Sequence, residues 1–197
     1  MKSYVKLALI IAGSLSAVLL LASVVYGAPP ASDPVTVNVT VDNFISISNP
    51  GDVTLATIAG TGGSSENSST WTVATNNDLG YKLEASATGA PTMTKGADSF
   101  ADYINGAPVP WAVAAADSAF GFSAEGSATA VGTWGTPGLG SGNYRGFNGA
   151  TAIEVANNGN ETAGENTTLY FKAEVGATHL QASGLYSANL TITATAL

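Results

Sequence analysis

The amino-acid sequence predicts an all-β protein: a single antiparallel two-sheet sandwich of about 8–10 strands, preceded by an N-terminal hydrophobic export segment. Several stretches alternate apolar and polar residues, which is the period of a strand. Charged residues make up 10% of the chain, and glycine, alanine, serine and threonine are abundant. This composition suits strands and turns better than helices. Beyond residue 27, no stretch repeats apolar residues at the helical period.

Residues 1–27 have the layout of a secretory signal peptide. Lys2 and Lys6 come first, no charge follows from Leu7 to Gly27, and small residues precede a cleavage point before Ala28. An apolar run of about 20 residues can also span a bilayer, so an uncleaved membrane anchor is the alternative. Both interpretations export the rest of the chain and confine membrane contact to this segment.

The exported part is expected to be a Pro-rich spacer, residues 28–34, and one β-sandwich domain, residues 35–197. It keeps four cations against 14 acidic residues, a formal net charge of −10. Nucleic-acid binding needs clustered lysine and arginine, so we expect no nucleic-acid partner. Cysteine is absent, and stability must therefore come from the sheet core. We expect a secreted or cell-surface protein.

The first predicted strand is unusually long. "PVTVNVTVDNFISIS", Pro34 to Ser48, alternates throughout and would run more than twice the length of a typical strand. Asn43 and Phe44 interrupt the alternation, so a bulge or break divides the stretch into Val35–Asp42 and Phe44–Ser48.

The other elements follow in order from alternation and turn residues. A turn at 49–52 leads to a strand at 53–58 and a polar loop at 59–69. Strands at 70–75 and 81–87 flank a turn and suggest a hairpin. Short apolar pieces follow, and the Gly-rich stretch 132–149 predicts a long irregular loop or a run of turns. Strands are expected at 151–157 and 167–175, around a polar loop at 158–166, and within 185–197.

Catalytic chemistry is nearly excluded by the residue inventory. The chain has one histidine, His179, no cysteine, and none of the GxSxG, HExxH or dinucleotide-binding motifs. Asp98 and Asp102 are the nearest carboxylate pair, and solvated acids on a polar face explain them more simply than glycoside hydrolysis. We expect no enzyme and no cofactor.

Calcium binding is also the weaker explanation of the Asn- and Asp-rich stretches 76–80 and 157–166. They contain oxygen ligands but lack EF-hand spacing, and turns require the same residues. We expect no metal site.

Five Asn-x-Ser/Thr sequons are candidates for glycosylation, whereas chance alone gives about three matches. Their positions on predicted polar faces or loops permit glycans. The asparagines are Asn38, Asn67, Asn160, Asn166 and Asn189.

Aromatic residues of the 132–149 stretch could contact a sugar. Trp134, Tyr144 and Phe147 lie there beside Arg145, and an exposed ring can stack on a sugar face. Alternatively, these rings close the open end of a barrel or sandwich.

The early valines suggest self-association. A strand that extends past its own sheet leaves backbone groups unpaired, and a neighbouring subunit can use such a strand to complete its own sheet. The candidates for donation are Val35, Val37, Val39 and Val41, which follow the spacer directly. Alternatively, Val35–Asp42 folds back as an edge strand of its own sandwich.

Two blocks resemble known families over about a third of the chain. The tail "ASGLYSANLTITATAL" resembles the last strand of secreted sandwich proteins of the spore coat U and fimbrial type, where a Gly-x-Tyr segment opens a strand that ends in alternating threonine. "STWTVATNNDLGYKLEASA" is similar to exported bacterial surface proteins and, more distantly, to WxL-type wall-binding domains. The chain lacks the cysteines of the fimbrial group and a pair of Trp-x-Leu motifs. The resemblance implies an exported β-sandwich and transfers no functional residue.

The sequence therefore predicts an exported structural cell-surface protein, a filament or pilus-like subunit that assembles by donating its N-terminal strand. The alternative is a carbohydrate- or cell-wall-binding module that uses the 132–149 loop.

Overall fold

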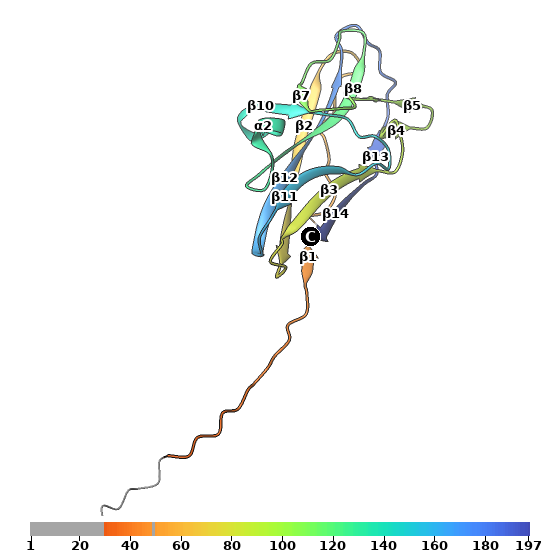
Figure 1. Cartoon of the computed structure of the whole chain (residues 1–197). Helices are drawn as coiled ribbons and strands as arrows, with labels where there is room; N and C mark the ends of the chain where they lie inside the picture. Colours follow the sequence, from red (N-terminus) through yellow and green to blue (C-terminus); the bar gives the residue numbers. More distant parts are fainter. Residues whose placement is uncertain (1–29, 49) are drawn as a thin grey trace, which may run out of the picture. The chain divides into compact units, whose positions relative to one another are not determined.

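The computed structural model describes residues 30–48 and 50–197. The predicted export segment and the first two residues of the spacer lie outside this part. The chain divides into an N-terminal unit that ends at Thr40 and a unit from Val41 to Leu197 (Figure 1). Within the described residues, no helix is long and apolar enough to cross a membrane.

The fold is all-β, as predicted. The described residues contain fourteen strands, more than expected, because the turn-rich middle of the chain forms many strands of two to four residues. The six longest are β2 (Ser64–Thr75), β3 (Tyr81–Ala87), β8 (Ser118–Gly126), β11 (Ile153–Asn158), β12 (Thr162–Val175) and β14 (Leu190–Ala196). The short strands are β1 (Ile45–Ile47), β4 (Met93–Lys95), β5 (Asp98–Ser99), β6 (Ala101–Asp102), β7 (Val109–Pro110), β9 (Gly135–Thr136), β10 (Ser141–Tyr144) and β13 (Ser187–Ala188).

Four sheets organise these strands. The largest has the order β1-β2-β12-β8-β6, and a second has the order β11-β3-β14. Two small sheets, β7-β10-β9 and β13-β4-β5, complete the fold. The 132–149 stretch contains β9, β10, a 3-10 helix η1 (Pro137–Leu139) and most of a four-residue helix α2 (Val131–Trp134). It is therefore more regular than the predicted irregular loop or run of turns.

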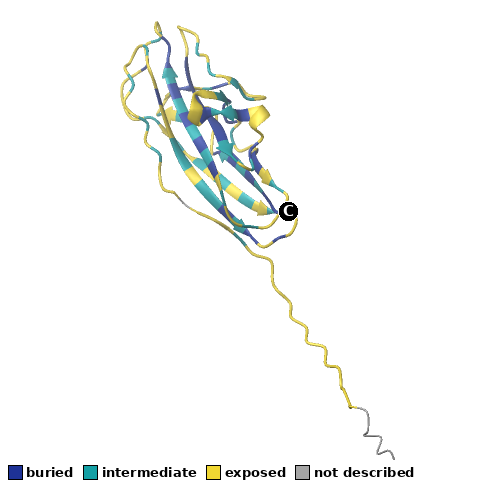
Figure 2. Ribbon diagram, turned by 90° about the vertical axis from the view of Figure 1, so that its left-hand side faces the viewer, coloured by how far each residue is buried: buried dark blue, intermediate teal, exposed yellow. Residues whose placement is uncertain are grey.

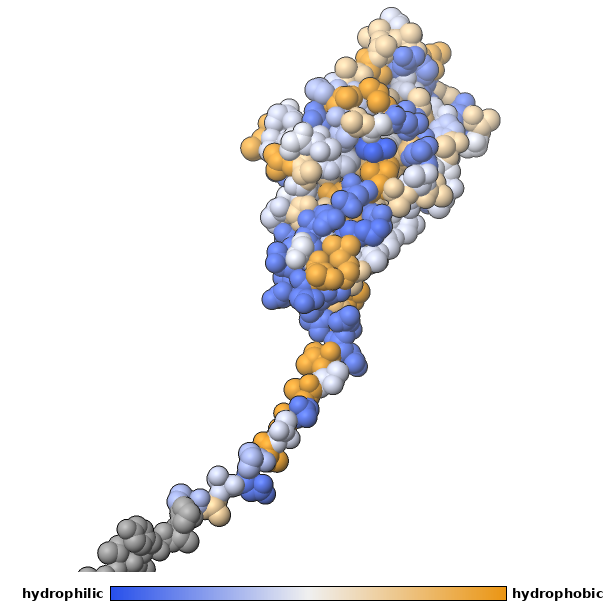
Figure 3. Space-filling view, in the orientation of Figure 1, coloured by the Kyte–Doolittle hydropathy of each residue, from blue (hydrophilic) through white to orange (hydrophobic). Residues whose placement is uncertain are grey.

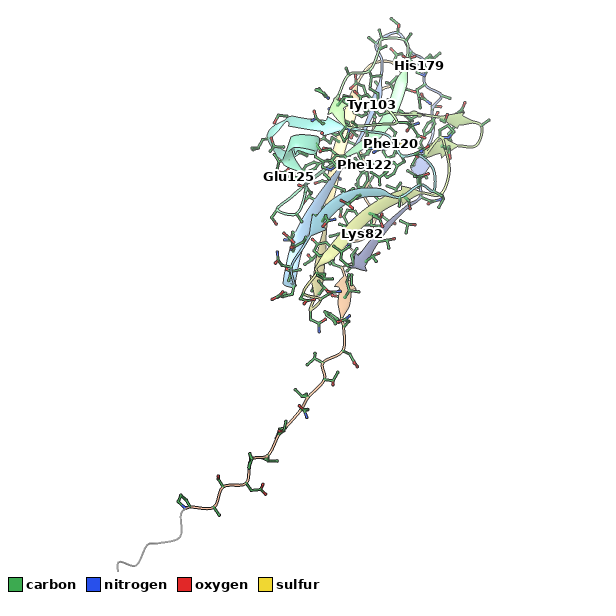
Figure 4. The ribbon with its side chains drawn as sticks, in the orientation of Figure 1. Lys82, Tyr103, Phe120, Phe122, Glu125 and His179 are labelled. Carbon is green, nitrogen blue, oxygen red and sulfur yellow. The ribbon has the colours of Figure 1, made fainter. Side chains whose placement is uncertain are left out.

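One core cluster draws side chains from both large sheets. The inward rows of β12 and β3 are buried at every second residue, as a pleated strand requires (Figure 2). Phe120 and Phe122 enter the same cluster from β8 (Figure 4). The two large sheets therefore contribute to one shared core. In the five-stranded sheet β12 is the central strand, because it pairs with both β2 and β8.

Strand β8 is buried on both faces, unlike a strand with one solvent-facing side. Gly121 lies on its other face, where an added Cβ would come within 2.7 Å of the Arg145 carbonyl oxygen and 2.9 Å of the Tyr103 Cβ. The backbone and side chains of the middle region press directly on β8 here, and glycine permits that close approach.

The predicted strand at 53–58 is wrong. Val53, Leu55 and Ile58 pack against the core, but residues 50–59 form no strand. The alternating apolar residues of this stretch reflect packing against the core. A strand also requires a regular ladder of backbone hydrogen bonds to a neighbouring strand. Pro50 has no N–H to donate, and Thr54 instead accepts a hydrogen bond from the Asn67 side chain at 2.9 Å.

The predicted hairpin of 70–75 with 81–87 is also wrong, although both stretches are strands. β2 and β3 belong to different sheets, so the turn at 76–80 carries the chain from one sheet to the other. The polar loops predicted at 59–69 and 158–166 are shorter than expected, because β2 begins at Ser64 and β12 begins at Thr162. The strands at 81–87, 151–157 and within 185–197 are confirmed by β3, β11 and β14.

Candidate assembly site

The alternating stretch at Pro34–Asp42 is exposed along its whole length. It forms no strand, and its four valines, Val35, Val37, Val39 and Val41, are between 75% and 87% exposed. Apolar and more polar residues alternate along it in the space-filling view (Figure 3). Residues 34–41 of this stretch are exposed, alternate in polarity and carry no charge, features that favour pairing with another strand.

The chain becomes fixed to the sheet immediately after these valines. The Asn76 side chain donates to the Asp42 carbonyl oxygen at 2.9 Å and accepts from the Phe44 N–H at 2.7 Å. Strand β1 then pairs with the end of β2, with Ile45 opposite Thr75. The predicted interruption at Asn43-Phe44 thus coincides with the start of pairing: the second half of the long stretch joins β2, and the first half has no strand partner within the described chain.

The three aromatic residues proposed for sugar contact are interior side chains. Trp134, Tyr144 and Phe147 are 3%, 5% and 0% exposed. Phe147 stacks on Phe122 with ring centroids 4.3 Å apart, and Trp134 tilts against the same ring at 5.3 Å. Trp134 and Phe147 belong to the main core cluster, and Tyr144 belongs to a second cluster with Tyr103. Burial of all three rings against other side chains leaves none of them exposed for stacking on a sugar.

A second, smaller aromatic cluster was not recognised in the sequence. Trp111 stacks on Tyr103 at 4.3 Å and meets the edge of Tyr144 at 5.2 Å. The Trp111 Nε1–H donates to Glu174 at 2.7 Å, and Lys172 lies 5.4 Å from the Trp111 ring centroid. The alternation of Tyr170, Lys172 and Glu174 on the outward face of β12 was the available signal.

The polar groups of this cluster bind one another. The Tyr144 hydroxyl donates to Glu66 at 2.6 Å, and Lys172 pairs with the same carboxylate at 3.7 Å. Burial, followed by the hydrogen bond to Glu66, raises the pKa of Tyr144. These partners are supplied by the protein itself, and the cluster packs against the outward side chains of β12.

The three residues considered for catalysis, His179, Asp98 and Asp102, have partners within the protein. The His179 ring nitrogens lie 2.9 Å from the Ala116 carbonyl oxygen and 3.1 Å from the Gln181 side-chain oxygen; His179 is labelled in Figure 4. Asp98 pairs with Lys95 at 2.9 Å, and Asp102 accepts the Thr92 N–H at 2.9 Å. Among the described residues, no three histidine, aspartate or glutamate side chains form a group that could hold a metal ion.

All five sequon asparagines lie on the surface. Two of them, Asn67 and Asn166, have side-chain hydrogen-bond partners. The Asn67 amide nitrogen, where a sugar would attach, donates to Thr54, and Asn166 accepts from the Thr72 hydroxyl at 2.7 Å. Asn38, Asn160 and Asn189 remain the more accessible acceptor positions.

Glu165, on β12, links β3, β11 and the residue that follows β8. Its carboxylate accepts hydrogen bonds from the Tyr81 hydroxyl at 3.3 Å and from the side chains of Ser127 and Asn158. Burial, then the charge of Glu165, raises the pKa of Tyr81 to about 12.

We expect alkaline pH to destabilise the protein through Tyr81. In the unfolded chain a tyrosine ionises near pH 10, whereas folded Tyr81 keeps its proton up to about pH 12. The folded state binds more protons in this window, so the free energy of unfolding falls as the pH rises from about 10 to 12. Thermal unfolding measured across this range checks the prediction. Tyr81→Phe should show a shallower loss, and an identical slope in both proteins contradicts it.

No protein-family model matches the chain, and no curated protein sequence matches it.

Proposed function

We propose that the protein is an exported structural subunit of the cell surface, a two-sheet β-sandwich that assembles into filaments by donating the strand Val35–Asp42 to a neighbouring copy. One observation carries the proposal: four valines at every second position are almost fully exposed on a segment without a strand partner in the described chain. Donated strands combine this alternation with unpaired backbone groups.

Energetics explain why the segment needs a sheet and not merely an apolar surface. Burying a valine contributes about 1.5–3 kcal/mol, while fixing the backbone costs about 1–2 kcal/mol per residue. Over the seven residues from Val35 to Val41, the burial of four valines roughly cancels the cost of ordering. Backbone hydrogen bonds to an acceptor strand supply the remaining stability, and an extended strand satisfies both requirements together.

Head-to-tail donation leads to an open polymer. The donated strand and the sheet that receives it are different surfaces of one chain, so each added copy presents a new free strand or a new free site. The alternative function, a carbohydrate- or cell-wall-binding module, has less support, since Trp134, Tyr144 and Phe147 are buried.

The test is negative-stain electron microscopy of residues 28–197 over a concentration series. We expect filaments from this chain and dispersed particles from Val37→Asp/Val39→Asp, which places charges among side chains that must be buried. The matched control, Thr36→Asp/Asn38→Asp, adds the same charge to the opposite face and should still assemble. Equal assembly of the two double variants, or filaments from a chain that begins at Phe44, contradicts strand donation.

A further inference from the structure

We propose that the open edge of β14 receives the donated strand, so that Val35–Val41 of a second copy of this chain pairs with Leu190–Ala196. This inference rests on the function proposed above and specifies its acceptor site.

Strand β14 is the last strand of its sheet: it pairs with β3 and has no second ladder partner among the described residues, although β1 lies close to it. Two backbone hydrogen bonds at the ends of β14 show which of its residues bond to β3. The Thr88 N–H donates to the Asn189 carbonyl oxygen, and the Leu197 N–H donates to the Gly80 carbonyl oxygen, both at 3.1 Å. In an antiparallel ladder, bonded pairs alternate with non-bonded pairs. The odd-numbered residues of β14 therefore bond to β3, and the N–H and C=O groups of Leu190, Ile192, Ala194 and Ala196 point to the open edge.

The core is incompletely covered along the same edge. Leu190, Ile192 and Ala194 pack against the core cluster and remain partly exposed. Their neighbours across the ladder on β3, from Tyr81 to Ala87, are buried. One more strand beside β14 would cover this inner row.

The valine segment matches β14 residue for residue. Each has seven residues, with four apolar side chains at alternate positions and three small polar ones between them. When the valines join the inner row, Thr36, Asn38 and Thr40 join the outer row, which in β14 consists of three threonines. Threonine pairs across strands are favourable, and the match holds for either strand direction.

Charge also favours this pairing. Neither Val35–Val41 nor Leu190–Ala196 contains a charged residue, although the chain beyond residue 27 has a formal net charge of −10. Two copies therefore meet through surfaces that do not add to their mutual repulsion. On the neighbouring strand, Lys82 and Glu84 form an ion pair at 3.0 Å and neutralise each other.

The two other long edges are less suitable. Along β2, the Thr72 N–H is bonded to the Ser48 side chain and the Ser68 N–H to the Asn67 side chain, each at 2.8 Å. Along β11, a register shift between Glu154 and Ala156 interrupts the strand, and such bulges discourage strand addition. The edge of β14 has neither feature.

Ala194→Pro tests the acceptor edge within residues 28–197. Because the Ala194 N–H points away from β3, proline removes no bond of the β14–β3 ladder, and proline is tolerated when its missing N–H lies on the open side of an edge strand. Ala194→Val is the matched control, since it keeps the N–H. We expect filaments from Ala194→Val and folded monomers from Ala194→Pro.

A peptide experiment separates the acceptor site from assembly. A fluorescent peptide of residues 34–42 is titrated into Val37→Asp/Val39→Asp, which keeps β14 but cannot donate, with Ala194→Val or Ala194→Pro added. Fluorescence anisotropy should show saturable binding of the peptide to the variant that carries Ala194→Val. The affinity for the variant that carries Ala194→Pro should be at least tenfold weaker.

Each outcome decides between the two proposals. If the Ala194→Pro and Ala194→Val variants assemble equally and bind the peptide equally, β14 is not the acceptor. Strand donation to another site would still be consistent with that result. If no protein assembles and the peptide binds neither, strand donation fails as well. Should circular dichroism show that Ala194→Pro is unfolded, Ile192→Lys replaces it. This variant keeps the N–H and places a charge in the inner row, and its unimpaired assembly would overturn the β14 site.

Discussion

Replacing Phe122 with alanine should lower the free energy of unfolding by about 3–5 kcal/mol. Phe122 is fully buried, stacks on Phe147 and contacts Trp134. Its removal leaves a cavity where β8, α2 and the chain after β10 meet, and the rigid rings around it cannot collapse to fill the space. Urea unfolding followed by tryptophan fluorescence measures the change.

Phe44→Ala is the matched control for this prediction. The same atoms are deleted, but Phe44 is 53% exposed and lies next to β1 rather than in the core. We expect it to cost about 1 kcal/mol or less. Equal losses in the two variants would mean that Phe122 does not support the core in the way its burial indicates.

Gly80→Ala should be nearly as damaging, with a loss of about 2–4 kcal/mol. Gly80 has φ of +79°, and an added Cβ would lie 1.8 Å from the Asn158 carbonyl oxygen. Both the turn between β2 and β3 and the end of β11 would have to move. Its carbonyl also accepts the Leu197 N–H at 3.1 Å, so the end of β14 would be disturbed too.

Gly96→Ala separates backbone strain from this steric clash. Gly96 has φ of +59°, and an added Cβ there meets nothing within 4 Å. The alanine should therefore cost about 1 kcal/mol, from the left-handed backbone alone. Thermal unfolding of both variants provides the comparison, and a similar drop in Tm for the two would contradict the clash at Asn158.

Alternation of apolar and polar residues correctly predicted those strands that have one buried face and one more exposed face. Tyr81–Ala87 was predicted with its observed bounds because its inward residues are buried and its outward ones are not. The same criterion misjudged Ser64–Ser69: small polar residues there continue β2, since β12 supplies a full ladder beside them. Backbone pairing of this kind depends on a partner about a hundred residues away, which local composition does not report.

The candidate site was predictable in part for the same reason. The valine pattern at Val35–Val41 was visible in the sequence, and the break at Asn43-Phe44 marked where pairing with β2 begins. For Trp134, Tyr144 and Phe147 the sequence offered both sugar contact and burial, because a Gly-rich stretch places its rings by tertiary contacts. The open edge of β14 was likewise hidden, since an edge strand and a central strand can have the same alternation.

The strand order has a consequence for how the chain reaches its folded state. β2 has its long pairing with β12, and β3 pairs with β11 and β14, so both main sheets join the first half of the chain to its last quarter. Such non-local pairings form slowly, on a timescale of milliseconds to seconds. Neither sheet can be completed until the C-terminal strands have been synthesised. A nascent chain therefore lacks the partners of β2 and β3 for most of its synthesis, and both strands are made long before the strands that pair with them.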